Sequence, residues 1–219
     1  MATDPVMVAI DGFGNESLAE QAYRILERMI VMLELEPGTV VTEGRLIDLT
    51  GMGRTPVREA IQRLAWEGLM DVRPRSGIAI ASINPEDFAK VIDAREGVER
   101  VLARDAARFG SPRDYERLEK AAMTMRSAIP AEDIATFLDA DKAFDVVLGS
   151  ASNNPYAVRL AAPLQTHSRR FWFHLRPSSG ISASANAHAA LIEAIVSRQP
   201  DHASDTAGKL MNYLRTLAP

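Results

Sequence analysis

The sequence predicts a mostly α-helical protein with an N-terminal winged helix-turn-helix and a C-terminal all-α helical bundle. Two short helical stretches meet at a glycine-containing corner between residues 43 and 67, and two short strand candidates follow them. Beyond residue 85 no strand pattern appears, and apolar residues recur at helical spacing between Gly, Pro and Asn breaks. We therefore expect a flexible arm over 1–17, a winged helix-turn-helix over 18–83 and a helical domain over 85–217.

Composition limits the classes of function. The 219 residues are 47% hydrophobic, carry a net charge of -4 and include no cysteine. A globular chain with a packed core is expected, without disulfides or thiolate chemistry. Because no basic excess exists, a DNA-binding function depends on where individual arginines lie. No signal peptide or long apolar run is present, so we expect a soluble, cytoplasmic protein with no membrane partner.

The first helix is expected from Ser17 to about Leu33. Ser17 suits an N-cap, and Glu20 three residues later completes a capping box. The apolar stripe of this helix consists of Leu18, Ala22, Ile25, Leu26, Met29, Ile30 and Leu33. Pro37-Gly38 then predicts a turn, and a short helix over 43–50 leads into the corner at 51–53.

The stretch from Arg54 to Glu67 predicts the second helix of the helix-turn-helix, with Pro56 in its first turn, where a missing N–H costs nothing. Two faces separate on this helix. Its apolar face holds Val57, Ala60, Ile61 and Leu64, and its polar face holds Arg54, Thr55, Arg58 and Gln62. Two arginines one turn apart suit a DNA major groove, because a guanidinium binds guanine or phosphate with two hydrogen bonds. Taken alone, the same face could equally be a solvated charged surface.

A hairpin wing is expected after this helix, with strands over 70–73 and 78–81. Its tip contains Arg75 and Gly77, which could reach a minor groove or phosphates. Trp66 is expected to pack beneath the wing as a core residue.

The C-terminal bundle is divided by turn residues into six predicted helices. They are expected near 85–109, 112–128, 131–152, 155–175, 183–198 and 201–217, with Pro163 kinking the fourth.

Polar residues interrupt the apolar faces of three of these helices. Asp141 and Asp145 share a stripe with Leu138 and Leu148, His188 lies among isoleucines, and Arg95 lies among large apolar residues and Glu99. A buried carboxylate without a partner costs several kcal/mol, so these groups should meet a cation, a metal or each other. We therefore expect one shared pocket, although His188 could equally be a core histidine with a satisfied partner.

From Leu18 to Ile83 the chain resembles the DNA-binding domain of the GntR family of bacterial transcription regulators. The resemblance rests on Pro37-Gly38, the Arg-Thr-Pro-Val-Arg-Glu-Ala run from 54 to 60, Glu67-Gly68-Leu69 and Gly77. It implies that Arg54, Thr55 and Arg58 contact operator DNA and that Gly77 enters the minor groove. Where the family usually has Ser or Thr, this chain has Gly53. Because one recognition helix reads few base pairs, we expect a homodimer on a palindromic double-stranded operator.

Residues 85–217 resemble the FCD effector-binding domain of the FadR subfamily, which implies a small organic acid as effector. Arg95 matches an arginine that holds the carboxylate, and Asp141 and His188 match two of four ligands of a zinc or nickel ion. Asp145 and Tyr213 stand where the other two ligands, both histidines, are usual. The remaining Asp141, Asp145 and His188 would suit Mg²⁺ or Mn²⁺. Without a metal, Tyr213 would act as a hydrogen-bond donor in the pocket.

Three functions compete on this sequence. A ligand-responsive transcription regulator, which is not an enzyme, accounts for both halves of the chain. A metal-dependent enzyme using Asp141, Asp145 and His188 would leave the recognition stretch unexplained, and no Walker loop, GxGxxG or GxSxG motif accompanies it. A winged helix that only docks proteins is disfavoured by Arg54 and Arg58, because docking cores are usually depleted in charge.

Overall fold

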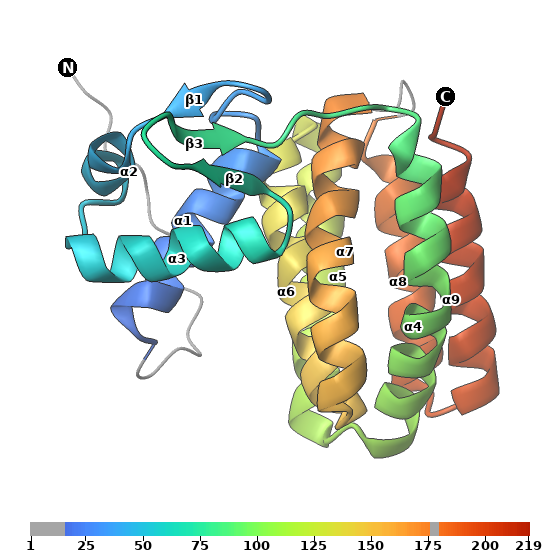
Figure 1. The fold of residues 1–219 in the computed structure, drawn as a ribbon. Coiled ribbons are helices and arrows are strands. Elements are labelled where there is room, and N and C mark those ends of the chain that lie inside the picture. The colour runs from blue at the N-terminus through green and yellow to red at the C-terminus, as the bar shows by residue number, and fades with distance from the viewer. Residues whose placement is uncertain (1–15, 176–179) are drawn as a thin grey trace. The chain divides into compact units, whose positions relative to one another are not determined.

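The computed structural model describes residues 16–175 and 180–219. Their contacts divide into two compact units, one within Met1–Arg28 and Val40–Ile80 and the other within Met29–Thr39 and Ala81–Pro219. The first unit contains short helices beside a small sheet, and the second is built mainly of long helices (Figure 1). The predicted fold class, a winged helix-turn-helix followed by an all-α bundle, is confirmed.

The N-terminal unit contains a helix-turn-helix and a three-stranded antiparallel sheet. In chain order its elements are α1 (Leu18–Val31), β1 (Val40–Val41), α2 (Glu43–Thr50), α3 (Arg54–Trp66), β2 (Met70–Arg73) and β3 (Gly77–Ile80). The strand order is β1-β3-β2, so the hairpin β2–β3 is the expected wing, and β1 extends it on the β3 side. We did not predict β1, because two residues are too few to show a strand pattern.

Local chemistry explains where these helices begin and end. The Thr42 side chain caps α2 by accepting from the Arg45 N–H at 3.2 Å, and Gly51, at φ 66°, ends it in the left-handed conformation. At the end of α3, Gly68 has φ 77°, and the Leu69 N–H donates to the Leu64 carbonyl at 2.9 Å. This Schellman-type ending turns the chain directly into β2.

Two expectations about side chains of this unit were wrong. Trp66 is 90% exposed and does not pack beneath the wing. It follows Leu64 by two positions, about 200° around the helix, and so lies away from the buried face. Leu69 faces the core independently of Trp66, because the turn at Gly68 separates the two. Leu18, assigned to the apolar stripe of α1, is 60% exposed at the first position of that helix.

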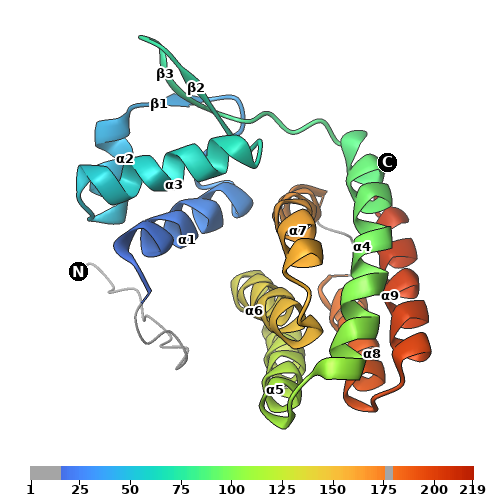
Figure 2. The ribbon, with the colours of Figure 1, turned by 60° about the horizontal axis from the view of Figure 1, so that its bottom comes forward.

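The C-terminal unit is a bundle of long helices that run side by side (Figure 2). In chain order they are α4 (Asp87–Phe109), α5 (Pro112–Ala128), the short 3₁₀ helix η1 (Ile129–Ala131), α6 (Ile134–Ser152), α7 (Pro155–Leu175), α8 (Ser182–Val196) and α9 (Pro200–Arg215). Helix α4 packs against α6, α7, α8 and α9, so its inward face meets residues from most of the bundle.

The bundle helices agree closely with the expected ranges. Helix α6 begins at Ile134, three residues later than expected, because η1 precedes it and Asp133 caps it by accepting from the Thr136 N–H at 3.0 Å. In the part of the chain that the structure describes, no helix is long and apolar enough to cross a membrane. The N-terminal arm up to residue 15 and residues 177–179 of the expected break over 177–180 lie outside the described residues.

Candidate DNA-binding and effector sites

The polar face of α3 is exposed along its length. Arg54, Thr55, Arg58 and Gln62 are all exposed, whereas Val57, Ala60, Ile61 and Leu64 on the opposite face are buried. A helix anchored by one apolar face in this way holds its polar face on a rigid support. The arrangement has the dimensions and the charge that a major groove accepts.

Both arginines of this face share one carboxylate, a contact that the sequence did not indicate. Arg54 Nε lies 3.3 Å from Glu43 Oε1, and Arg58 Nε lies 2.9 Å from Glu43 Oε2. Glu43 occupies the first position of α2 and bridges the two helices of the motif. Both arginines make this contact through Nε.

The wing tip places Arg75 and Gly77 as the sequence suggested, at the turn of the hairpin. Arg75 is exposed and has φ 63°, and Gly77 has φ 99° and pairs with Arg73 across the turn. A side chain on Gly77 would come within 2.9 Å of both Val40 Cγ1 and Val41 O. Gly77 is therefore required by the close approach of β1, whatever it contacts on DNA.

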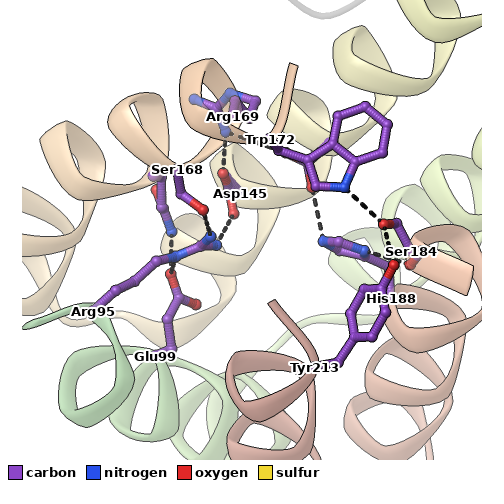
Figure 3. A network of polar contacts seen from close by, with 11 residues as sticks. Arg95, Glu99, Asp145, Ser168, Arg169, Trp172, Ser184, His188 and Tyr213 are labelled. Carbon is purple, nitrogen blue, oxygen red and sulfur yellow. Dashed lines mark hydrogen bonds and ion pairs between the residues drawn. The ribbon is translucent and has the colours of Figure 1, made fainter. Parts of the chain in front are cut away.

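In the helical unit, polar residues from the five helices α4, α6, α7, α8 and α9 form one cluster (Figure 3). Arg95 on α4 donates through Nε to Glu99 Oε1 at 2.7 Å, through Nη1 to Ser168 Oγ at 3.1 Å and through Nη2 to Asp145 Oδ1 at 3.4 Å. Arg169 on α7 donates through Nη1 to Asp145 Oδ2. Asp145 is thus held by two arginines, one on each carboxylate oxygen.

Asp141 lies one turn before Asp145 on α6 and joins a second pair of groups. Its Oδ2 lies 3.5 Å from Arg169 Nη1. Its Oδ1 lies 2.8 Å from His188 Nε2, but the two groups are not aligned for a hydrogen bond, so this contact is an ion pair. His188 Nδ1 lies 2.8 Å from the Ser184 carbonyl oxygen. Both ring nitrogens of His188 therefore face acceptors.

Tyr213 on α9 lies at the edge of this cluster. Its hydroxyl is 3.0 Å from Ser184 Oγ, which also accepts a hydrogen bond from Trp172 Nε1 at 2.9 Å (Figure 3). The structure thus places Arg95, Asp141, Asp145, His188 and Tyr213 in one connected network, with Asp145 on its Arg95 side and Tyr213 on its His188 side.

The network moves the pKa values of its acidic and imidazole groups in different directions. Burial raises the pKa of the Asp141 carboxyl, but His188 and Arg169 more than offset this effect, and the pKa falls to about 2. Burial also raises the pKa of Asp145, and there Arg95 and Arg169 do not offset it, so the pKa rises to about 7. Burial lowers the pKa of His188, but the nearby Asp141 carboxylate raises it by more. The net change in the pKa of His188 is therefore upward.

Several network residues were missed in the sequence, chiefly Arg169, Ser168, Trp172 and Ser184. A pattern was available for those on α7. Gln165, Ser168, Arg169 and Trp172 follow Ala161 at helical spacing, so polar residues interrupt a buried face there as they do on α6. What the sequence could not indicate is which carboxylate each arginine meets.

The space inside the network is small. A cavity of about 20 Å³ is lined by residues of α4, α6, α7, α8 and α9, among them Arg95, Asp141, Arg169 and His188. That volume is enough for about one water molecule. An organic acid would enter only if neighbouring helices or side chains moved.

The residues present do not fit the divalent metal ion that the resemblance implies. Each carboxylate of Asp141 and Asp145 faces the guanidinium of Arg169, and both nitrogens of His188 face acceptors. Within residues 16–175 and 180–219, no three His, Asp or Glu side chains converge as metal ligands. Tyr213, which stands where the resemblance implies a histidine ligand, contacts Ser184.

Comparisons with known proteins agree with the two-unit architecture. Residues 18–80 match the family described as "Bacterial regulatory proteins, gntR family", and residues 90–212 match the family described as "FCD domain". The HTH-type transcriptional repressor RspR of Escherichia coli K12 is 32% identical over 134 residues, which cover 61% of this chain and 59% of the repressor. The fatty acid metabolism regulator protein of Shewanella halifaxensis is 29% identical over 170 residues, covering 68% of this chain and 67% of that protein.

Solved structures share the fold at low sequence identity. A structure titled "E. coli McbR/YncC" has a TM-score of 0.77 at 18% identity and covers 91% of this chain and 95% of that chain. A putative transcriptional regulator GntR from Rhodococcus sp. RHA1 has a TM-score of 0.65 at 21% identity, covering 92% and 95% of the two chains. Both likenesses concern the fold alone.

Proposed function

Because the chain belongs to the gntR family of bacterial regulatory proteins and carries an FCD domain, we propose that it is a transcription regulator of the FadR subfamily. In this proposal it acts in the cytoplasm, binds a palindromic operator as a homodimer and responds to a small carboxylate effector. Both relatives compared above are named as regulators, which gives the metal-dependent enzyme no support.

The observation that carries the DNA-binding function is the exposed face of α3. Arg54 and Arg58, with side chains 71% and 57% exposed, lie one turn apart on a helix whose other face is buried. A guanidinium in a major groove can donate two hydrogen bonds to guanine O6 and N7, which specifies a base pair. Arg75 at the wing tip would add a contact to the minor groove or to phosphate.

Two observations support a homodimer. One recognition helix contacts few base pairs, and the helical unit has exposed apolar residues. A single recognition helix contacts only a few base pairs, and two-fold symmetry matches a palindrome. On the helical unit, Tyr156 and Leu160 of α7 are 74% and 66% exposed and lie four residues apart on one face. A second copy of the chain would bury such a face.

The effector function rests on Arg95 and the network around it. A carboxylate ligand would meet guanidinium donors in a buried site, where charge-assisted hydrogen bonds are strong. Because the cavity holds about one water, ligand entry must separate groups that now touch. A ligand that binds the opened arrangement better shifts the dimer toward it, typically by a coupling of about 1–3 kcal/mol.

The test is selection of preferred duplexes from random DNA, followed by titration of the best duplex at fixed salt. Replacing Arg58 by Ala should weaken this binding by about 1–3 kcal/mol and relax specificity at one base pair. The matched control is Arg117→Ala, which removes an exposed arginine from α5 in the helical unit. Equal binding by both variants and the wild type would contradict the assigned role of α3.

A further inference from the structure

The buried network forms one chain of alternating charges. In order, the groups in contact are His188, Asp141, Arg169, Asp145, Arg95 and Glu99. They come from α8, α6, α7 and α4, and every one of them is at most 6% exposed. Gln165 ends the chain by donating to Glu99 Oε1 at 2.8 Å.

Arg169 occupies the centre of this chain. Its Nη1 lies between the two carboxylates of α6, in contact with Asp145 Oδ2 and 3.5 Å from Asp141 Oδ2. Its Nη2 donates to Thr166 Oγ1 at 3.2 Å, which holds the guanidinium plane in place. A divalent cation bridging the two carboxylates would have to share their oxygens with a fixed positive charge, and like charges in a buried site repel strongly.

His188 continues the chain on the α8 side. Its Nδ1 lies 2.8 Å from a backbone carbonyl oxygen and its Nε2 lies 2.8 Å from a carboxylate oxygen of Asp141. The same carboxylate lies 3.5 Å from Arg169 Nη1. An ion bound between His188 and Asp141 would therefore also lie close to the positive charge of Arg169.

We propose that Arg169 is the resident cation of this site, so that the helical unit needs no metal ion and an anionic ligand is held directly by Arg169 and Arg95. The second part of the proposal rests on the effector function proposed above. The two arginines hold opposite oxygens of Asp145, and a ligand carboxylate can take the same two positions. The ligand class is therefore a small carboxylate that displaces the side chain of Asp145.

The first experiment measures metal dependence of the wild-type protein, purified without a polyhistidine tag. We expect elemental analysis to find no stoichiometric metal. We also expect the Tm to be unchanged by a chelator and by Zn²⁺, Ni²⁺ or Mn²⁺. One equivalent of bound metal, or a Tm that falls on chelation, would overturn the proposal.

The second experiment compares Arg169→Lys with Arg169→Gln by thermal unfolding. The lysine retains a cation beside Asp141 and Asp145, so this variant should stay closer to the wild-type Tm and remain insensitive to Mn²⁺. The glutamine leaves two carboxylates without that cation, so the Tm should fall by several degrees and recover in part with Mn²⁺. Equal Tm values for the two variants, without a response to Mn²⁺, would refute the role of the Arg169 charge.

The ligand part is tested with acetate as the probe, against chloride at equal ionic strength. Acetate should raise the Tm of Asp145→Asn more than that of the wild type, because the side chain it must displace no longer carries a charge. No difference between the two proteins would refute direct capture of a carboxylate. None of these measurements uses DNA, so their failure is distinguishable from a failure of the DNA-binding function.

Discussion

At the start of α3, Gly53 occupies the N-cap position and makes no side-chain hydrogen bond to the helix. Its φ of -70° is open to any residue, and a Cβ there would meet only Pro56 Cδ, at 3.9 Å. A serine would therefore fit without strain and would place a hydroxyl at the first turn of the recognition helix. Single residues such as this one determine how firmly a functional face is held.

Gly53→Ser should stabilise the protein by about 0.5–1 kcal/mol, because the hydroxyl caps the helix and the unfolded chain loses freedom. Urea unfolding measures the change. Gly53→Ala is the control, since alanine restricts the unfolded chain but is a poor N-cap. If alanine stabilises as much as serine, the hydroxyl does not cap the helix.

At His188 the free energy of unfolding should depend on pH. Its pKa is raised in the folded protein, chiefly by Asp141 acting against burial. The stability that it contributes is therefore complete below pH of about 6.5 and is lost as the pH rises through the folded value. The pKa of Asp145 is also raised, to about 7 in the folded protein. Its contribution to stability should therefore fall as the pH rises from the pKa of the unfolded chain to about 7.

His188→Gln should flatten the decline in unfolding free energy above neutral pH, because the variant lacks the imidazole whose pKa the folded protein raises. The measurement is urea unfolding of both proteins at several pH values from 6 to 9. His202→Gln, at an exposed histidine of α9, is the control and should leave the wild-type slope intact. A His188→Gln protein with the full wild-type slope would show that other groups cause it.

At the scale of elements, helix α2 does more than support α3. Glu43 in its first turn contacts Nε of both Arg54 and Arg58, and so restricts two long side chains before DNA arrives. Exposed ion pairs of this kind are each worth about 0.2–1 kcal/mol. Their effect on recognition comes from orientation and from the negative charge that Glu43 places near phosphates.

Glu43→Gln should lower the ratio of specific to non-specific DNA affinity, because the arginines lose their orientation while repulsion of phosphates also falls. We expect the ratio to change roughly two- to thirty-fold, in line with about 0.4–2 kcal/mol for two exposed pairs. Titration of the selected duplex and of a scrambled duplex gives this ratio. Asp48→Asn removes an equal charge from another exposed position of α2, and an equal effect there would attribute the change to net charge alone.

At the scale of the whole molecule, the proposed function requires two copies and two states. The proposed dimer brings two recognition helices to one operator, and the proposed ligand must open a network that is closed around a cavity of about 20 Å³. Each polar group in that network has partners, so opening it exchanges internal ion pairs for contacts with the ligand. Such an exchange can couple the helical unit to DNA binding without any change in the residues of α3.

Leu160→Glu should shift the protein from dimer to monomer at micromolar concentration, because a charge on the exposed face of α7 cannot be buried against a second copy. Sedimentation velocity measures this shift. Met123→Glu, at a residue of α5 that is 63% exposed, introduces the same charge elsewhere on the helical unit. Should the Leu160→Glu protein remain a dimer, the interface lies on another face.

Much of this architecture could be predicted from local sequence. Helical periodicity, capping residues and turn residues place every long helix to within a few residues, because these effects act between neighbours in the chain. The polar face of α3 and the buried positions of Arg95, Asp141, Asp145 and His188 follow from the same spacing. Hydrophobic periodicity thus indicated most of the side chains that lie inside, with Trp66 and Leu18 as exceptions.

Only the tertiary structure decided which of the buried groups meet. Arg95 contacts Asp145 and Ser168, which are 50 and 73 residues away, and Arg169 contacts Asp145 across 24 residues. The sequence placed two acids and a histidine on inward faces and left open whether a metal, a cation or a wet cavity would balance them. The answer depends on how α4, α6, α7 and α8 pack, because a buried charge is stabilised by whichever opposite charge lies within a few ångströms, regardless of distance along the chain.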